Sequence, residues 1–156
     1  MNVHDYLIDH AAFDWQELLG RWHWRMSGEM TIWLMNRFGD LFVTQKDGSI
    51  SWLRLDDGTF ACIAKTKDEF LDRVDQPDFM NDWLMVPLVD RLVAAGKILG
   101  KGQCYAFVQI PILGGDYTIE NVVIRDIARQ YKAMGPLHEK LKDIPNGTKI
   151  SFQIQK

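Results

Sequence analysis

The hydrophobic and polar positions in the first part of the chain predict one helix followed by several short strands. Apolar residues recur at helical spacing over residues 5–19, and Gly20 is expected to end that helix in the left-handed conformation. Four short apolar runs follow, separated by Gly-Asp, Asp-Gly and Asp-Asp-Gly sequences that favour tight turns. Sequential strands joined by tight turns form an antiparallel meander, and we expect strands at residues 30–36, 41–45, 50–55 and 60–64.

Helical spacing replaces the strand pattern after residue 65. Thr66 and Glu69 form a capping box, in which the hydroxyl accepts from a free backbone N–H and the carboxylate reaches back to another. Pro77 suits the first turn of a second helix because its missing N–H is not needed there. Pro87 lacks the N–H that a helix interior needs, so we expect it to kink or split this second helix before Gly96 ends it.

The last third returns to strands and adds one more helix. We expect strands at residues 104–110 and 117–124, on either side of a glycine-rich loop. Residues 127–144 have helical spacing interrupted by a Gly-Pro pair, which predicts a bent or two-part helix. Strict alternation over residues 150–154 predicts a half-buried final strand. The chain is therefore expected to form a single α+β domain over residues 1–156, a mostly antiparallel sheet with helices packed on one face.

Composition limits the class of protein. The 156 residues fit one domain of common size, and a hydrophobic share of 47% can supply a core. A net charge of −3 argues against direct nucleic-acid binding. No apolar run approaches the roughly 18 residues of a membrane span, and residues 1–10 do not resemble a signal peptide. Cys62 and Cys104 are too few for a disulfide framework, so we expect a cytoplasmic protein.

No residue pattern predicts catalysis, a metal site or a bound cofactor. Cys104 and His138 are the one attractive pair of nucleophile and base, but Cys104 lies in an apolar strand where a buried structural cysteine is typical. Spacings typical of metal ligands, such as Cys-x-x-Cys or His-Glu-x-x-His, do not occur. The glycines at 100–102 and 114–115 lack the spacing of phosphate-binding loops. We therefore expect a protein that is not an enzyme and that holds no metal or cofactor.

Acidic residues concentrate in the middle of the chain. Residues 56–82 hold eight acidic and three basic side chains, a net charge of −5. Most such segments are solvated helical faces. The alternative is an acidic surface that attracts a basic partner over a distance.

Several motifs occur in an order and spacing that resemble a known family. The sequence is similar to the C-terminal domain of type VI secretion DNase-immunity proteins, a domain that often follows a GAD-like domain. The resemblance covers about residues 30–154, and no GAD-like domain is recognisable before it. It rests on the segments Arg37-Phe38-Gly39-Asp40-Leu41-Phe42, Asn81-Asp82-Trp83-Leu84, Gly102-Gln103-Cys104-Tyr105, Leu113-Gly114-Gly115-Asp116-Tyr117 with Glu120-Asn121, and His138 with Asp143-Ile144-Pro145-x-Gly147-Thr148.

The resemblance implies a cytoplasmic immunity protein that binds and neutralises a cognate secreted toxin, such as a type VI secretion nuclease. Such a protein needs a stable scaffold and one complementary surface, and no catalytic residues are implied. Nucleases carry basic substrate clefts, so an acidic face would favour fast association. The candidate toxin-binding residues are the acids of the middle segment and the exposed turn of the glycine loop: Asp56, Asp57, Asp68, Glu69, Asp72, Asp75, Gly114, Gly115, Asp116 and Tyr117.

Two other classes stay open from the residues alone. A small-ligand sensor or regulatory module would need a pocket into which Glu120, Asn121 and His138 converge. A hydrolase would need Cys104 beside His138.

Overall fold

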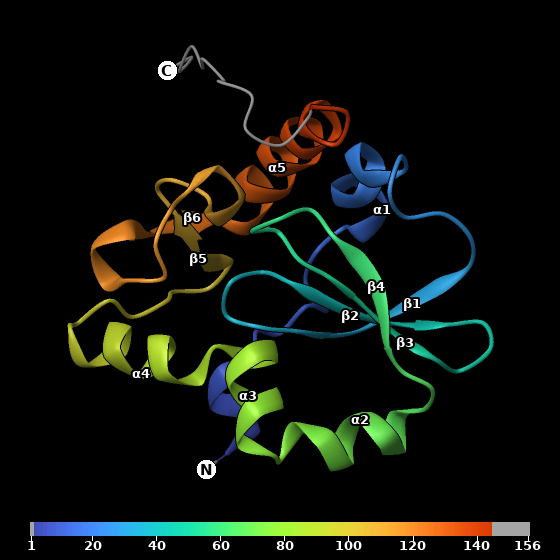
Figure 1. Cartoon of the computed structure of the whole chain (residues 1–156), viewed down its shortest axis with the longest axis horizontal. Coiled ribbons are helices and arrows are strands. Elements are labelled where there is room, and N and C mark those ends of the chain that lie inside the picture. Colours follow the sequence, from blue (N-terminus) through green and yellow to red (C-terminus); the bar gives the residue numbers. More distant parts are fainter. Residues whose placement is uncertain (1, 145–156) are drawn as a thin grey trace.

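A four-stranded antiparallel sheet lies at the centre of the structure, a computed structural model that describes residues 2–144. Its strands follow one another in space in chain order, so the expected meander is confirmed (Figure 1). The turns at Gly48 and Gly58 have φ values of 88° and 74°, a region that favours glycine. The strands are β1 (Met30–Met35), β2 (Leu41–Gln45), β3 (Ile50–Leu53) and β4 (Phe60–Ala64).

Three helices follow the sheet and begin and end where the local signals place them. The capping box is formed: the Glu69 N–H donates to Thr66 Oγ1 at 3.1 Å, and Glu69 Oε2 accepts from the Lys65 N–H at 2.8 Å. The expected split before Pro87 is also present, because Met85 takes a left-handed conformation between two helices. The helices are α2 (Lys67–Val74), α3 (Pro77–Leu84) and α4 (Val86–Ala94).

The expectation of one helix over residues 5–19 is wrong. The segment forms a 3-10 helix η1 (Val3–Tyr6), an extended stretch, one helical turn α1 (Trp15–Leu18) and a second 3-10 helix η2 (Leu19–Trp22). The extended stretch pairs with the end of β1, where the Ile8 N–H donates to the Met35 carbonyl at 2.8 Å. Asp14 then starts α1 by accepting from the Glu17 N–H. Pairing with the sheet edge and a new N-cap therefore outweigh the apolar spacing.

A second sheet holds the last two described strands, β5 (Gln103–Phe107) and β6 (Val122–Asp126). The strand expected at 117–124 begins five residues later, because a 3-10 helix η4 (Ile119–Asn121) precedes it. Another 3-10 helix, η3 (Pro111–Leu113), lies in the loop between the strands. The last helix, α5 (Ile127–Leu141), runs through Pro136 as one element and not as two. The strand expected at 150–154 lies outside the described residues.

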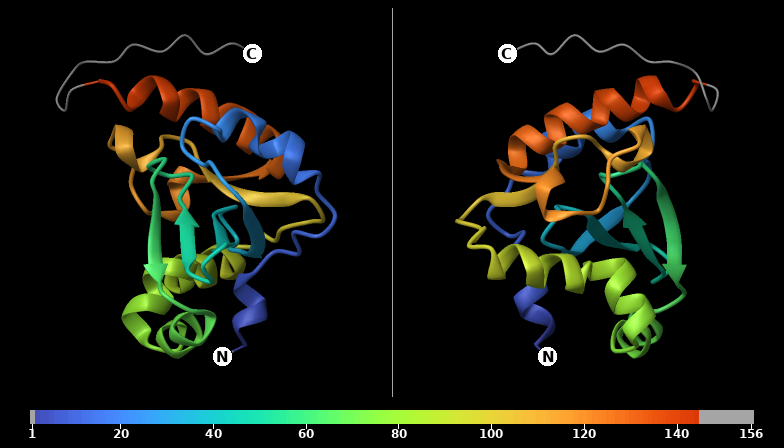
Figure 2. Two further views of the ribbon diagram at one scale, coloured as in Figure 1. Left: turned by 90° about the vertical axis from the view of Figure 1, so that its right-hand side faces the viewer. Right: turned by 60° about the vertical axis from the view of Figure 1, so that its left-hand side comes forward.

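Helices lie on both sides of the central sheet, which corrects the expectation of a single covered face. On one face, Phe42 contacts Phe70 of α2 and Trp83 of α3 with ring centroids 5.3 and 6.5 Å apart. On the other face Leu41 and Val43 are fully buried, because neighbouring residues of a strand point in opposite directions. Figure 2 shows α1, α5 and the small sheet on that side and α2, α3 and α4 on the first. The α+β class itself is confirmed.

Candidate functional site

The loop between β5 and β6 contains four of the candidate residues and is cross-linked by the side chains of Asn121 and Gln109. Asn121 Nδ2 donates to the carbonyls of Gln109 at 2.9 Å and Asp116 at 2.8 Å. The Gln109 N–H donates back to Asn121 Oδ1 at 3.0 Å. Gln109 Nε2 adds a bond to the Leu113 carbonyl at 2.8 Å. A loop cross-linked in this way is ordered before it meets a partner, which lowers the entropic cost of binding.

The two glycines of this loop have different structural reasons. Gly114 has a φ of 93° and ends η3 in the left-handed conformation. Gly115 does not have a positive φ, but a Cβ built there would lie 1.7 Å from the Gln109 carbonyl oxygen. Nothing larger than a hydrogen fits at position 115, so both glycines shape the loop and need not touch a partner.

Large apolar side chains are exposed along this loop. The exposed fractions are 62% for Val108, 48% for Ile112 and 45% for Tyr117, and we call these three residues the loop patch. The Tyr117 ring also meets Phe107 edge to face, with centroids 5.2 Å apart. Apolar side chains held at the surface by a rigid loop are typical of protein-binding sites.

Asp56, the first of the candidate acids, is buried beneath the loop and is not a surface acid. Its carboxylate accepts from Arg54 Nε at 3.0 Å and Arg54 Nη2 at 2.7 Å. It also accepts from the Tyr117 hydroxyl at 2.7 Å, and its side chain is 2% exposed. Partial burial and this bond to Asp56 raise the pKa of Tyr117, so the phenol stays a donor. The structure thus joins two predicted site residues, with Asp56 supporting Tyr117 from below.

The other acids divide between structural and exposed positions. Asp57 accepts from the backbone N–H and the hydroxyl of Thr59 and shapes the β3–β4 turn. Glu69 is half-buried and pairs with Arg73 at 2.7 Å in addition to its capping bond. The remaining three acids, Asp68, Asp72 and Asp75, are exposed, and their spacing places them on one face of α2.

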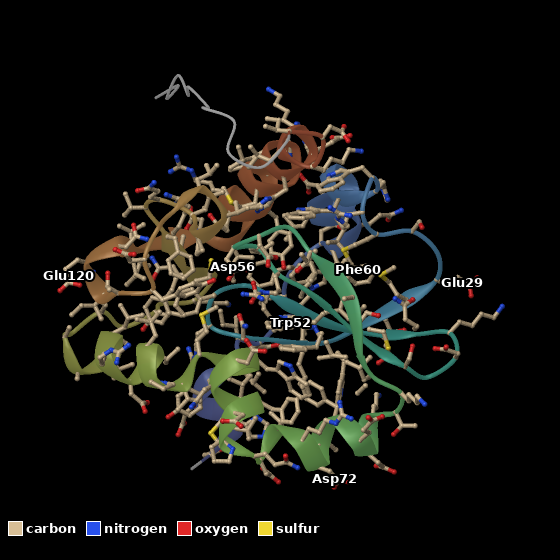
Figure 3. All side chains as sticks on the ribbon, in the orientation of Figure 1. Glu29, Trp52, Asp56, Phe60, Asp72 and Glu120 are labelled. Carbon is tan, nitrogen blue, oxygen red and sulfur yellow. The ribbon has the colours of Figure 1, made fainter. Side chains whose placement is uncertain are left out.

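The exposed acids of α2 and the loop patch belong to different parts of the surface. Figure 3 shows Asp72 on α2 at one end of the molecule, well away from the labelled Asp56 under the loop. The structure therefore does not gather the predicted residues into one site. It offers two separate surfaces, an acidic helix face and an apolar loop.

A buried polar cluster that the sequence analysis missed fixes the strands beneath the loop. Asn36 Nδ2 donates to Asp40 Oδ2 at 3.0 Å and to the Trp83 carbonyl at 2.9 Å, and its Oδ1 accepts from the N–H groups of Phe38 and Asp40. Asp40 Oδ1 accepts from the Leu55 N–H at 2.9 Å. Burial, and then the charge of Asp56, raise the pKa of Asp40 to about 7. The available signal was an Asn and an Asp flanking a glycine turn between two apolar strands.

Cys104 and His138 occupy structural positions. Burial raises the pKa of Cys104 to about 12, which keeps its sulfur in the weakly nucleophilic thiol form. His138 Nε2 lies 2.7 Å from the Leu55 carbonyl oxygen, so this nitrogen carries the proton and donates. Burial lowers the pKa of His138 and favours the neutral ring. No hydrogen bond joins the two side chains within residues 2–144, and this arrangement does not support a nucleophile–base pair.

The pocket required by the sensor hypothesis is not formed by the expected residues. Asn121 is used within the loop, His138 is buried against Leu55, and Glu120 is exposed. In the described part of the chain no group of three or more His, Cys, Asp or Glu residues could hold a metal ion. No helix of that part is long and apolar enough to cross a membrane.

Comparison with known proteins finds a matching family model and a solved structure with a related fold. Residues 64–138 match the family model described as T6SS immunity protein Tdi1, C-terminal, which confirms the resemblance over that segment. No curated protein matches the chain significantly. The crystal structure of Atu4351 from Agrobacterium tumefaciens is similar, with a TM-score of 0.51 and 17% sequence identity over 77% of this chain. This chain spans 63% of that one, and at this identity the likeness shows the fold alone.

Proposed function

From the match of residues 64–138 to the family model of the T6SS immunity protein Tdi1 C-terminal domain, we propose that the chain binds a cognate secreted toxin and neutralises it. The matched segment contains both the exposed acids of α2 and the loop patch. The family supports an immunity role in type VI secretion. The binding surfaces, the toxin class and a cytoplasmic location are our proposals.

The observation that carries the proposal is the rigid, exposed apolar loop. Asn121 and Gly115 fix its backbone, and Val108 and Ile112 are about half exposed or more. Burying apolar surface against a partner contributes roughly 25 cal/mol per Å² before the costs of association. A loop that needs no reordering keeps more of this gain, so the loop patch would form the centre of the interface.

Binding, and not bond chemistry, is the proposed mode of action. Cys104 is a buried thiol, and His138 is a neutral ring held on a backbone carbonyl. An immunity protein of this kind acts by covering a surface that the toxin needs. Its affinity for the toxin then depends on shape complementarity and apolar contact at the interface, as in inhibitor complexes of standard size.

The proposed toxin class is a nuclease, and the acidic face of α2 supports this choice. Asp68, Asp72 and Asp75 are exposed on one face of the helix. A nuclease must attract a polyanion and therefore carries basic residues around its cleft. An acidic helix face increases the encounter rate with such a surface, more than it increases the final affinity.

The test is binding to the toxin candidate encoded beside the gene for this chain. We expect the two purified proteins to form a complex and the toxin to lose activity in it. Ile112→Asp should weaken the complex by roughly tenfold or more, since it places a charge in the apolar centre. Ala133→Asp on α5 is the control, because it adds the same charge at an exposed position outside both the loop patch and the acidic face of α2. A complex that is absent, or one that Ile112→Asp weakens no more than the control does, would contradict the proposal.

A further inference from the structure

A hollow on the surface lies between the N-terminal 3-10 helix η1 and α4, and none of the three loop-patch residues is among the residues that line it. It has a volume of about 380 Å³, within the range of pockets that hold small ligands or side chains. Figure 2 shows η1 next to α4 in both views. Its lining includes Asp5, Tyr6, Arg37, Asp90, Val93 and Ile98.

One side of this pocket is polar and carries more negative than positive charge. The Tyr6 hydroxyl donates to Asp90 Oδ1 at 2.7 Å, which fixes the carboxylate at the pocket wall. That bond raises the pKa of Tyr6 to about 12, so the phenol remains a donor. Arg37 Nε donates to the Asp5 carbonyl at 3.1 Å and ties the guanidinium to η1. Two acidic residues, Asp5 and Asp90, and one basic residue, Arg37, line the pocket, so it favours a ligand with one positive charge.

The other side of the pocket is apolar and open to solvent. Val93 is 48% exposed and Ile98 is 60% exposed. Val89 and Leu99 continue the apolar lining inward. A carboxylate next to an exposed aliphatic wall matches a flexible hydrocarbon chain that ends in a cation.

We infer that this pocket receives a lysine side chain of the toxin, with its ammonium group against Asp90 and its methylene chain against Val93 and Ile98. This inference rests on the function proposed above. A partner protein is favoured over a free amine because the two exposed apolar side chains need a larger covering surface than a small molecule provides. Asp90, Val93 and Ile98 also lie within the segment that matches the family model.

The first experiment tests the pocket in the free protein. Nα-acetyl-lysine methylamide is titrated while the amide resonances of the chain are recorded by NMR, with Nα-acetyl-norleucine methylamide as the uncharged probe of similar length. We expect the lysine probe to move the resonances of Asp90, Val93 and Ile98, and Asp90→Asn to weaken its binding roughly threefold or more. Ile98→Ala should also weaken it. Glu29→Gln removes one exposed charge far from the pocket and should change nothing.

The second experiment asks whether the toxin uses the pocket. Asp90→Asn and Ile98→Ala should each raise the dissociation constant of the toxin complex roughly threefold or more, with Glu29→Gln as control. A complex that forms equally well with both variants would refute this inference and leave the immunity role intact. Absence of any complex would instead refute the immunity role. Probe binding that survives in Asp90→Asn, or equal binding of the norleucine probe, would show that the carboxylate does not recognise the cation.

Discussion

The hydroxyl of Tyr117 donates a hydrogen bond of 2.7 Å to the buried carboxylate of Asp56, across 61 positions of the chain. The bond connects the loop after β5 to the turn between β3 and β4, which belong to two different sheets. Arg54 holds the same carboxylate from the other side. The exposed aromatic ring of the loop patch is therefore oriented by a charge placed in the other sheet.

Tyr117→Phe should cost about 1–2 kcal/mol of unfolding free energy. The substitution keeps the ring contact with Phe107 but removes one donor from a buried carboxylate. Urea unfolding of Tyr117→Phe, Asp56→Asn and the double variant measures the coupling between the two residues. Strictly additive effects would show that this hydrogen bond contributes nothing to stability.

Gly115→Ala should be strongly destabilising or should rearrange the loop. The new methyl group would lie 1.7 Å from the Gln109 carbonyl oxygen, so the backbone must move. We expect a loss of about 1–3 kcal/mol and weaker toxin binding. Gly20→Ala is the matched control, because a Cβ at position 20 would meet nothing within 4 Å.

That control should leave stability unchanged or raise it by up to about 1 kcal/mol, since alanine restricts the unfolded chain. Thermal unfolding of both variants and the NMR shifts of the Asn121 side-chain amide provide the measurements. Equal stability of the two variants would contradict the tight packing of the loop at Gly115.

Asp40 should make stability fall as pH rises from about 4 to about 7. Burial, and then Asp56, raise its pKa from 3.8 to about 7, so the folded state holds a proton that the unfolded state has released. Stability from this group is complete below the unfolded pKa and is lost as pH rises through the folded pKa. The largest slope expected for one proton is about 1.4 kcal/mol per pH unit.

Asp40→Asn isolates this effect, because the variant cannot titrate at position 40. The unfolding free energy of the parent minus that of Asp40→Asn should therefore fall steadily as pH rises from about 4 to about 7. His138 acts in the opposite direction, since burial lowers its pKa and protonation opposes folding. It is present in both proteins and cancels in the difference. A difference that does not vary between pH 4 and pH 7 would contradict the raised pKa.

Elements with strong local signals could be predicted from the sequence. The turns at Gly48 and Gly58, the capping box of Thr66 and Glu69, and the split before Pro87 each depend on residues within a few positions of one another. The helix expected at residues 5–19 failed because its competitor, the edge of β1, lies far along the chain. A spacing pattern contains no information about such a distant backbone partner.

In the candidate site, too, features with local sequence signals could be predicted and features that depend on distant residues could not. The glycine loop and the acidic α2 were found because composition marks them. Asp56 looked like one more surface acid, and only the fold shows that Arg54 and Tyr117 enclose it. The roles of Asn36 and Asp40 also depend on Trp83 and Leu55, which are distant in sequence. Exposure of a charged side chain is a property of the tertiary structure and could not be predicted from local patterns.

The acidic face of α2 should control how fast the toxin binds. Replacing Asp68, Asp72 and Asp75 by Asn removes three exposed negative charges while leaving the Thr66 and Glu69 capping box in place. Because steering acts over a Debye length of about 8–10 Å, the association rate constant should fall several-fold at low salt and converge with the parent value at high salt. The dissociation rate constant should change much less, since these charges lie outside the apolar centre proposed for the interface. Stopped-flow association at several ionic strengths gives both constants. A variant with unchanged association and faster dissociation would place α2 inside the contact surface, and one with neither change would exclude it from toxin recognition.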